Sequence, residues 1–199
     1  MELKDSKTKE SLLRAFAGES QARNRYEYAA ETAQKEGLYV IENLFKYTAD
    51  QEKAHGKVFY EELKELNGEN LKIDGAYPIG SYDTTLKLLQ DAEHNEFEEY
   101  SVVYKDFSNI AKEEGFLQIA SKFEKISSIE KIHSERFKKY ASFLDAGMLF
   151  KDNIEVQWIC TNCGYIYEGK EAPKVCPICS YPQGYYIRFS DSDFNIKID

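Results

Sequence analysis

Two copies of a Glu-x-x-His motif, Glu52–His55 and Glu130–His133, are the residues of this sequence most suited to chemistry. Residues three apart share one face of a helix, so the carboxylate and the imidazole of each motif can reach the same metal ion. Two further apolar stripes of helical period are each interrupted by a glutamate, Glu19 and Glu93. One glutamate from each of two helices and Glu-x-x-His from each of the other two is the ligand pattern of di-iron bundles. Buried carboxylates need cations to neutralise them, so we expect two iron or manganese ions here.

An internal repeat supports this assignment. Glu19 precedes Glu52 by 33 residues, and Glu93 precedes Glu130 by 37 residues. Each pair of helices therefore resembles one copy of a helical hairpin, with the metals between the two copies. A single Glu-x-x-His on a helix is usually a solvated surface pair, but two copies with glutamate partners at matching depth argue against that alternative.

One carboxylate breaks the symmetry of the repeat. Glu96 follows Glu93 by three residues, whereas the residue three after Glu19 is Ala22. The metal site therefore has an extra carboxylate on one side. We expect one iron to exchange a ligand as its charge changes, for example His55 for Glu96.

Two tyrosines fall on the inward faces at matching positions. Tyr26 lies seven residues after Glu19, and Tyr100 lies seven after Glu93. Core packing with a satisfied hydroxyl and a hydrogen-bonding or proton-donating role beside the metals are both open for these residues. His94 points about 100° away from Glu93 on a helix of 3.6 residues per turn, so we do not expect it to be a ligand.

A second metal site is indicated by the four cysteines. Cys160 and Cys163 form one Cys-x-x-Cys knuckle, and Cys176 and Cys179 form another. Two such knuckles build a tetrahedral four-thiolate site, and their spacing fits zinc or a single iron. The aromatic residues nearby favour a redox iron, because a dry shell and backbone N–H groups aimed at sulfur tune such a centre. A structural zinc ribbon remains the alternative.

The elements that position these residues are four long helices of about 30 residues, each roughly 45 Å long at 1.5 Å per residue. Apolar residues at steps of three and four indicate the helices, and glycines mark several of their ends. Four such helices with short connections predict a mainly α four-helix bundle, with 67–82 as the crossover between the second and third. The expected helices span 6–36, 39–66, 83–115 and 116–145.

Cysteine and histidine are segregated along the chain, which suggests two domains. All three histidines precede residue 150, and all four cysteines lie between 160 and 179. We expect a di-metal bundle over 1–146, a linker over 147–156 and a small metal-stabilised module over 157–199.

Composition excludes several other classes of protein. The chain has 199 residues, 42% of them hydrophobic, and a formal net charge of −9. An acidic chain without a basic half is not expected to bind nucleic acid. No apolar run approaches the roughly 18 residues of a membrane span, and the charged N-terminus lacks a signal-peptide core. We therefore expect a cytoplasmic protein without membrane association, in which reduced cysteines bind metal rather than form disulfides.

At this point the sequence resembles the rubrerythrin family. The resemblance rests on the stretch Ala17–Tyr26, on the glutamate and histidine motifs, and on Trp158–Glu168 with Cys176–Cys179. It implies a ferritin-like di-iron bundle, in which Glu52 and Glu130 bridge the irons, followed by a C-terminal rubredoxin-like domain. One departure is the stretch Ser180–Gln183 after the second knuckle, where relatives often have glycine and a basic residue.

The expected function is a non-haem di-iron peroxidase. It reduces hydrogen peroxide to water with electrons relayed through its own Fe(Cys)4 centre, which an external rubredoxin or NAD(P)H-dependent reductase reloads. Because the two centres of one chain are far apart along the last helix, we expect a homodimer or higher oligomer, packed head to tail. The residues expected to bind metal or act in catalysis are Glu19, Tyr26, Glu52, His55, Glu93, Glu96, Tyr100, Glu130, His133, Cys160, Cys163, Cys176 and Cys179.

Two rival functions use the same residues. A ferroxidase or iron-storage protein would use the same bundle, but it needs no dedicated electron-transfer module. A non-catalytic electron carrier or redox sensor would use the bundle as a scaffold, but seven ligands at one depth argue against a scaffold alone.

Overall fold

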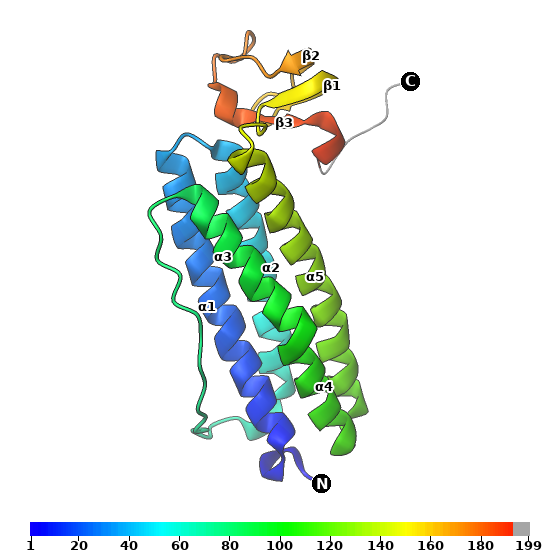
Figure 1. Ribbon diagram of the computed structural model, residues 1–199. Helices are drawn as coiled ribbons and strands as arrows, with labels where there is room; N and C mark the ends of the chain where they lie inside the picture. Colours follow the sequence, from blue (N-terminus) through cyan, green and yellow to red (C-terminus); the bar gives the residue numbers. More distant parts are fainter. Residues whose placement is uncertain (193–199) are drawn as a thin grey trace.

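The computed structural model describes residues 1–192. Long helices run side by side and form a bundle, and a small sheet covers the end at which the last helix finishes (Figure 1). The bundle elements are α1 (Lys7–Lys35), α2 (Tyr39–Glu62), α3 (Thr85–Glu98), a π-helix (Glu99–Val103), α4 (Tyr104–Glu113) and α5 (Leu117–Asp145). The sheet elements are β1 (Lys151–Cys160), β2 (Ile166–Glu171) and β3 (Tyr186–Arg188).

The helix ends follow from local sequence signals. The Ser6 side chain accepts a hydrogen bond from the Lys9 backbone N–H (3.1 Å) and so caps α1. Gly37 and Gly115 take positive φ values of 73° and 88° at the turns of the two hairpins, a conformation that glycine adopts without steric cost. The mainly α bundle is therefore confirmed. The N-cap of α3 is Thr84, one residue after the expected start of this helix at 83.

The third long helix is not uniform, which the periodic pattern does not reveal. Between α3 and α4, residues Glu99–Val103 form a π-helix. A π-turn inserts an additional residue into a helix and often marks a functional site. Side chains after Val103 are therefore shifted by one position relative to a continuous α-helix, and Tyr104 rather than Val103 is buried.

The hydrophobic core consists of two clusters along the bundle. One cluster includes Phe45, Leu89 and Phe137, and the other includes Phe59 and Phe123. In every long helix, the residues between the two clusters are the buried glutamates and histidines. The polar layer is therefore closed above and below by apolar side chains, which keep water out of it.

The sheet has the order β2-β1-β3 with antiparallel pairing throughout. It packs directly on the α1–α2 hairpin, where the rings of Tyr39 and Tyr185 stack at 4.3 Å. Gly184 lies so close to Gly37 that a Cβ atom at this position would come within 1.9 Å of the Gly37 carbonyl oxygen. The module is thus seated on the bundle by close backbone contact.

The segment that joins bundle and sheet differs from a free linker. Leu149 is buried in the core of the bundle, and β1 begins at Lys151. Arg188 ties the same segment down, because its guanidinium donates to the carbonyl oxygens of Met148 (2.8 Å) and Lys151 (2.6 Å). Residues 151–156 of the expected linker 147–156 are thus part of strand β1. Residues 193–199 of the expected module lie outside the described residues.

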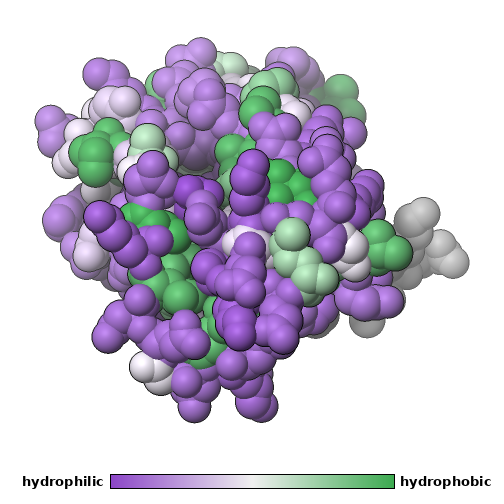
Figure 2. Space-filling model, turned by 90° about the horizontal axis from the view of Figure 1, so that it is seen from below, coloured by the Kyte–Doolittle hydropathy of each residue, from purple (hydrophilic) through white to green (hydrophobic). Residues whose placement is uncertain are grey.

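The surface is mostly hydrophilic. Figure 2 shows the bundle from the end opposite the sheet, where small hydrophobic patches lie among polar side chains. Within residues 1–192, no helix combines the length and hydrophobicity required to cross a membrane.

Candidate metal centres

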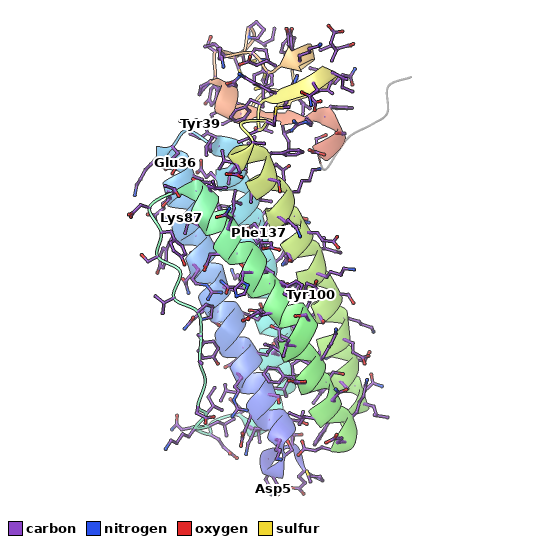
Figure 3. The ribbon with its side chains drawn as sticks, in the orientation of Figure 1. Asp5, Glu36, Tyr39, Lys87, Tyr100 and Phe137 are labelled. Carbon is purple, nitrogen blue, oxygen red and sulfur yellow. The ribbon has the colours of Figure 1, made fainter. Side chains whose placement is uncertain are left out.

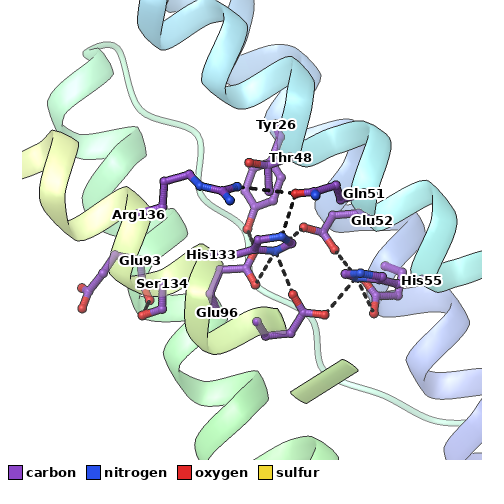
Figure 4. A network of polar contacts seen from close by, with 12 residues as sticks. Tyr26, Thr48, Gln51, Glu52, His55, Glu93, Glu96, His133, Ser134 and Arg136 are labelled. Carbon is purple, nitrogen blue, oxygen red and sulfur yellow. Dashed lines mark hydrogen bonds and ion pairs between the residues drawn. The ribbon is translucent and has the colours of Figure 1, made fainter. Parts of the chain in front are cut away.

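Six buried side chains meet between the two apolar clusters. They form two groups in which the ligand atoms lie within 4.8 Å of one another, and both groups share Glu52 and Glu130. Glu19 and His55 complete one group, whereas Glu96 and His133 complete the other (Figure 4). The arrangement therefore offers two adjacent cation positions, each with three carboxylates and one imidazole.

The two shared carboxylates face both positions at once. Glu52 places Oε2 3.0 Å from His55 Nδ1 and Oε1 3.0 Å from His133 Nδ1. Glu130 does the same, with Oε1 2.9 Å from His55 Nδ1 and Oε2 2.8 Å from His133 Nδ1. Each carboxylate thus offers one oxygen to each position, which is the geometry of a bridging ligand.

The buried groups of this cluster shift one another's pKa values strongly. Burial would raise the pKa of Glu52, but its pairs with His133 and His55 outweigh burial and lower the pKa to about 2. Burial would lower the pKa of His55, but Glu130 and Glu52 raise it to about 9. In contrast to Glu52, Glu96 has a raised pKa: burial and the charge of Glu52 raise it to about 8.

Several buried atoms of the cluster lack a hydrogen-bond partner. They include both carboxylate oxygens of Glu130, one oxygen each of Glu19, Glu52 and Glu96, and His133 Nδ1. Leaving a buried polar atom unpaired costs about 1–3 kcal/mol, and more when it is charged. Oxygen and imidazole ligands in this number suit iron or manganese, so the residues fit a pair of such cations.

Two buried tyrosines donate hydrogen bonds to Glu96 and Glu19, the terminal carboxylates, each of which belongs to only one of the two groups. The Tyr26 hydroxyl donates to Glu96 Oε1, and the Tyr104 hydroxyl donates to Glu19 Oε1 (2.5 Å). Each tyrosine therefore reaches from one helical hairpin to the glutamate of the other. The hydrogen-bonding role left open for Tyr26 is the one the structure contains.

The four cysteine sulfurs form the second centre. Cys160 Sγ lies 3.8 Å from Cys179 Sγ, and Cys163 Sγ lies 3.7 Å from Cys176 Sγ. A tetrahedron with metal–sulfur bonds of about 2.3 Å has edges of about 3.8 Å, so a metal ion fits among them. The sulfurs accept hydrogen bonds from backbone N–H groups, among them those of Tyr165 and Tyr181.

Comparisons with known proteins decide the family. The family model for rubrerythrin matches residues 10–141, and that for the rubrerythrin rubredoxin-like domain matches residues 158–187. The chain belongs to the rubrerythrin family. It is 45% identical over 191 residues to rubrerythrin of Clostridium perfringens, covering 96% of this chain and 98% of the relative. It is 42% identical over 185 residues to rubrerythrin of Nitratidesulfovibrio vulgaris, covering 92% and 95%.

Solved structures agree with this family assignment. Nigerythrin in its fully reduced, all-ferrous state superposes with a TM-score of 0.62 at 30% identity, covering 92% of this chain and 90% of that chain. A bacterioferritin of Desulfovibrio desulfuricans with a di-iron site has a TM-score of 0.63 at 24% identity, covering 71% and 82%, and shows the shared fold. This rubrerythrin-family chain thus combines a ferritin-like bundle and a rubredoxin-like module, with residues suited to a di-iron and a tetrathiolate centre.

The structure does not bring two of the expected residues to the di-iron cluster. Glu93 is half-buried and its side chain points away from the cluster (Figure 4), while its carbonyl oxygen accepts from Ser134 (3.1 Å). The ring of Tyr100 packs edge-on against Phe97, with 5.1 Å between the ring centroids. The expected counterpart of Glu19 is Glu93, whereas in the structure Glu96, one helical turn later, lies in the cluster.

Glu99 and Tyr104 take the places expected for Glu96 and Tyr100, and sequence reasoning missed both. Glu99 follows Glu96 by three residues, and burial, followed by the charges of Glu96 and Glu130, raises the pKa of Glu99 well above its usual range. A signal for the correct register exists. Glu96 precedes Glu130 by 34 residues, close to the 33 between Glu19 and Glu52, and the π-helix accounts for the extra residue.

Gln51 is a further residue that the motifs did not single out. Its Oε1 accepts from Arg136 Nη1 (3.4 Å) and lies 3.0 Å from His133 Nε2 (Figure 4). An amide oxygen is an acceptor, so His133 donates from Nε2 to Gln51, which would leave Nδ1, on the side of the shared carboxylates, to bind a cation. Such a partner fixes the tautomer and the orientation of a metal-binding histidine.

Proposed function

We propose that this protein is a peroxidase that reduces hydrogen peroxide to water. The observation that carries the proposal is the pair of overlapping ligand groups that share Glu52 and Glu130, because two adjacent cations can donate two electrons to one small oxidant. When bound, the two irons supply the electrons and the Lewis acidity that O–O cleavage requires. The balance is H2O2 + 2 e⁻ + 2 H⁺ → 2 H2O.

The ligand set we propose follows the observed geometry. Glu19, Glu52, His55 and Glu130 hold one ion, and Glu52, Glu96, Glu130 and His133 hold the other. Glu99, rather than Glu96, is then the carboxylate that exchanges with His55 as a ligand. Glu99 follows Glu96 by three residues, whereas the residue three after Glu19 is Ala22. The extra carboxylate on one side is the one expected from the sequence, but it stands three residues later in the chain.

The remaining residues of the cluster manage protons and water. Tyr26 and Tyr104 each hold a proton on the hydroxyl that contacts a terminal glutamate, so a proton is available at both ends of the cluster. The apolar clusters on either side exclude bulk water, which strengthens every electrostatic interaction between them. His133 is kept in one tautomer by Gln51.

Electrons are proposed to arrive through the tetrathiolate iron of a second subunit. Glu130 lies 15 residues before Asp145, so the di-iron centre is roughly 22 Å down α5 from the end that carries the module. The module is anchored to that end by Leu149 and Arg188. A head-to-tail dimer would bring the cysteine knuckles of one chain to the bundle of the other, and an NAD(P)H-dependent reductase in the cytoplasm would reload them.

The assay that tests this function compares hydrogen peroxide, oxygen and Fe(II) in parallel under steady-state conditions. We expect the highest kcat/KM for hydrogen peroxide. Glu52→Ala should abolish this turnover, because it removes a carboxylate shared by both ions, and should leave the visible absorption of the tetrathiolate iron unchanged. Undiminished turnover by Glu52→Ala, or turnover with Fe(II) and oxygen but not with peroxide, would overturn the proposal.

A further inference from the structure

A cavity of about 370 Å³ opens beside the di-iron cluster. It lies between α1, the crossover segment and the region where α3 passes through the π-helix into α4. Glu99 and Tyr104 line it at the cluster side, and Tyr77 of the crossover and Gly18 of α1 line it elsewhere. Tyr104 also donates to Glu19, so this side chain stands between the cavity and the metal site.

The position of Tyr77 in the wall is fixed by several contacts. Its hydroxyl donates to the Arg14 carbonyl oxygen (3.1 Å). A Cβ atom at Gly75 would come within 2.8 Å of its ring, so the turn before it has no space for a side chain. Arg14 in turn donates to the backbone oxygen (2.9 Å) and the side chain (2.7 Å) of Asp74. These contacts attach the crossover segment to α1 and hold the Tyr77 ring in the wall of the cavity.

Gly18 lines the cavity next to the Tyr77 ring. Glycine in the middle of a helix costs about 0.5–1 kcal/mol relative to alanine, yet α1 contains one directly before Glu19. A Cβ atom there would lie 3.7 Å from the Tyr77 ring, which is ordinary contact. Alanine therefore fits at this position, whereas a larger side chain would fill the cavity.

The cavity is much larger than hydrogen peroxide requires. A water molecule occupies about 30 Å³ in the liquid, so a peroxide with two heavy atoms uses a small part of the space. Ala15, Val103 and Phe107 give the lining an apolar part, and Arg14, Asn95 and Glu98 line it as well. A polar end beside the metals and an apolar stretch of wall match a molecule that has a peroxide group at one end and a hydrocarbon group at the other.

We propose that the cavity binds the hydrocarbon group of an organic hydroperoxide, ROOH, and that Tyr77 and Gly18 set the size of R. This inference rests on the proposed peroxidase function. The O–O bond is cleaved according to ROOH + 2 e⁻ + 2 H⁺ → ROH + H2O. The electrons come from the ferrous centre, which an external NAD(P)H-dependent reductase reloads, and Glu99 and Tyr104 lie at the peroxide end.

The test uses cumene hydroperoxide as the probe and Gly18→Leu as the variant, in the iron-loaded full-length protein. Gly18→Ala is the matched control, because its side chain fits without filling the cavity. We expect Gly18→Leu to lower kcat/KM for cumene hydroperoxide at least tenfold more than for hydrogen peroxide, and Gly18→Ala to change the ratio less than twofold. Iron content per chain shows whether each variant retains its centres. Val103→Phe, which fills the cavity from another wall, should change the ratio in the same direction.

A binding measurement separates this proposal from effects on turnover. The product alcohol, 2-phenylpropan-2-ol, should bind the oxidised wild-type protein and Gly18→Ala by calorimetry, and should not bind Gly18→Leu. Equal losses for both peroxides, alcohol binding that survives Gly18→Leu, or a wild type that reduces only hydrogen peroxide would each overturn the proposal. A wild type that reduces neither peroxide would instead show that the proposed function itself is wrong.

Discussion

Glu52 and Glu130 face each other across the bundle, and each presents one carboxylate oxygen to His55 and the other to His133 at 2.8–3.0 Å. This mutual arrangement defines two cation positions rather than one. Because both residues are almost fully buried, the negative charge they bring together has to be balanced within the bundle.

The ligand register in the third long helix is tested by iron content. Glu96→Ala should lower the iron bound in the bundle, because it removes a terminal carboxylate from the group that contains His133. Glu93→Ala should leave iron content unchanged, since that side chain points away from the cluster. Iron per chain, measured after reconstitution and corrected for the tetrathiolate iron by its visible absorption, distinguishes the two variants. Loss of iron in Glu93→Ala alone would restore the register expected from the sequence.

The crosswise tyrosine contact is tested by removing one hydroxyl. Tyr104→Phe leaves Glu19 Oε1 without its donor, and an unsatisfied buried group costs about 1–3 kcal/mol. We therefore expect a lower thermal midpoint of the bundle, followed by circular dichroism. Tyr100→Phe is the matched control, and its expected change is below about 0.5 kcal/mol. An equal fall in both variants would argue against a specific role for Tyr104.

The stability of the metal-free protein should fall as the pH rises. Although burial opposes it, Glu130 and Glu52 raise the pKa of His55 from 6.5 to about 9. The protonated ring therefore stabilises the fold fully below pH 6.5, and this contribution is lost as the pH passes through 9. We expect the thermal midpoint of the metal-free protein to decrease between pH 6.5 and 9, and that of His55→Gln to decrease less. A midpoint that rises over this range would contradict the ion pairs of the cluster.

The departure after the second knuckle predicts a stabilising substitution. Ser180 has a φ of 61° and Gly164, at the same place after the first knuckle, has a φ of 78°. Left-handed backbone costs a non-glycine residue about 1–2 kcal/mol, so Ser180→Gly should stabilise the module, by about 1 kcal/mol after the entropic cost of glycine is subtracted. Gly164→Ser should destabilise it. The loss of tetrathiolate absorption on heating measures both, and a lower midpoint for Ser180→Gly would contradict the prediction.

Much of the architecture could be predicted because its determinants are local and periodic. The helix that carries Glu19 and the one that carries Glu130 end within two residues of the glycines that terminate them. The paired Glu-x-x-His and Cys-x-x-Cys motifs fix their own geometry through spacing alone. These features need no knowledge of the tertiary structure.

The third long helix could not be predicted in the same way. The π-helix Glu99–Val103 shifts Tyr104 by one position, and a pattern of period 3.6 carries no signature of such a shift. The roles of Gln51 and Tyr77 were hidden for a related reason. Each lies beside a residue that is far away in the sequence, Gln51 beside His133 and Tyr77 beside Gly18, so only the folded chain brings them together.

Mössbauer spectroscopy of the iron-57 protein tests the central claim most directly. The fully reduced protein is mixed anaerobically with one equivalent of hydrogen peroxide, frozen and measured. If Glu52 and Glu130 bridge two irons, both irons of the bundle should become ferric together and appear as one magnetically coupled pair, apart from the tetrathiolate iron. Isolated ferric ions in the bundle, or consumption of peroxide while the bundle irons stay ferrous, would contradict the account.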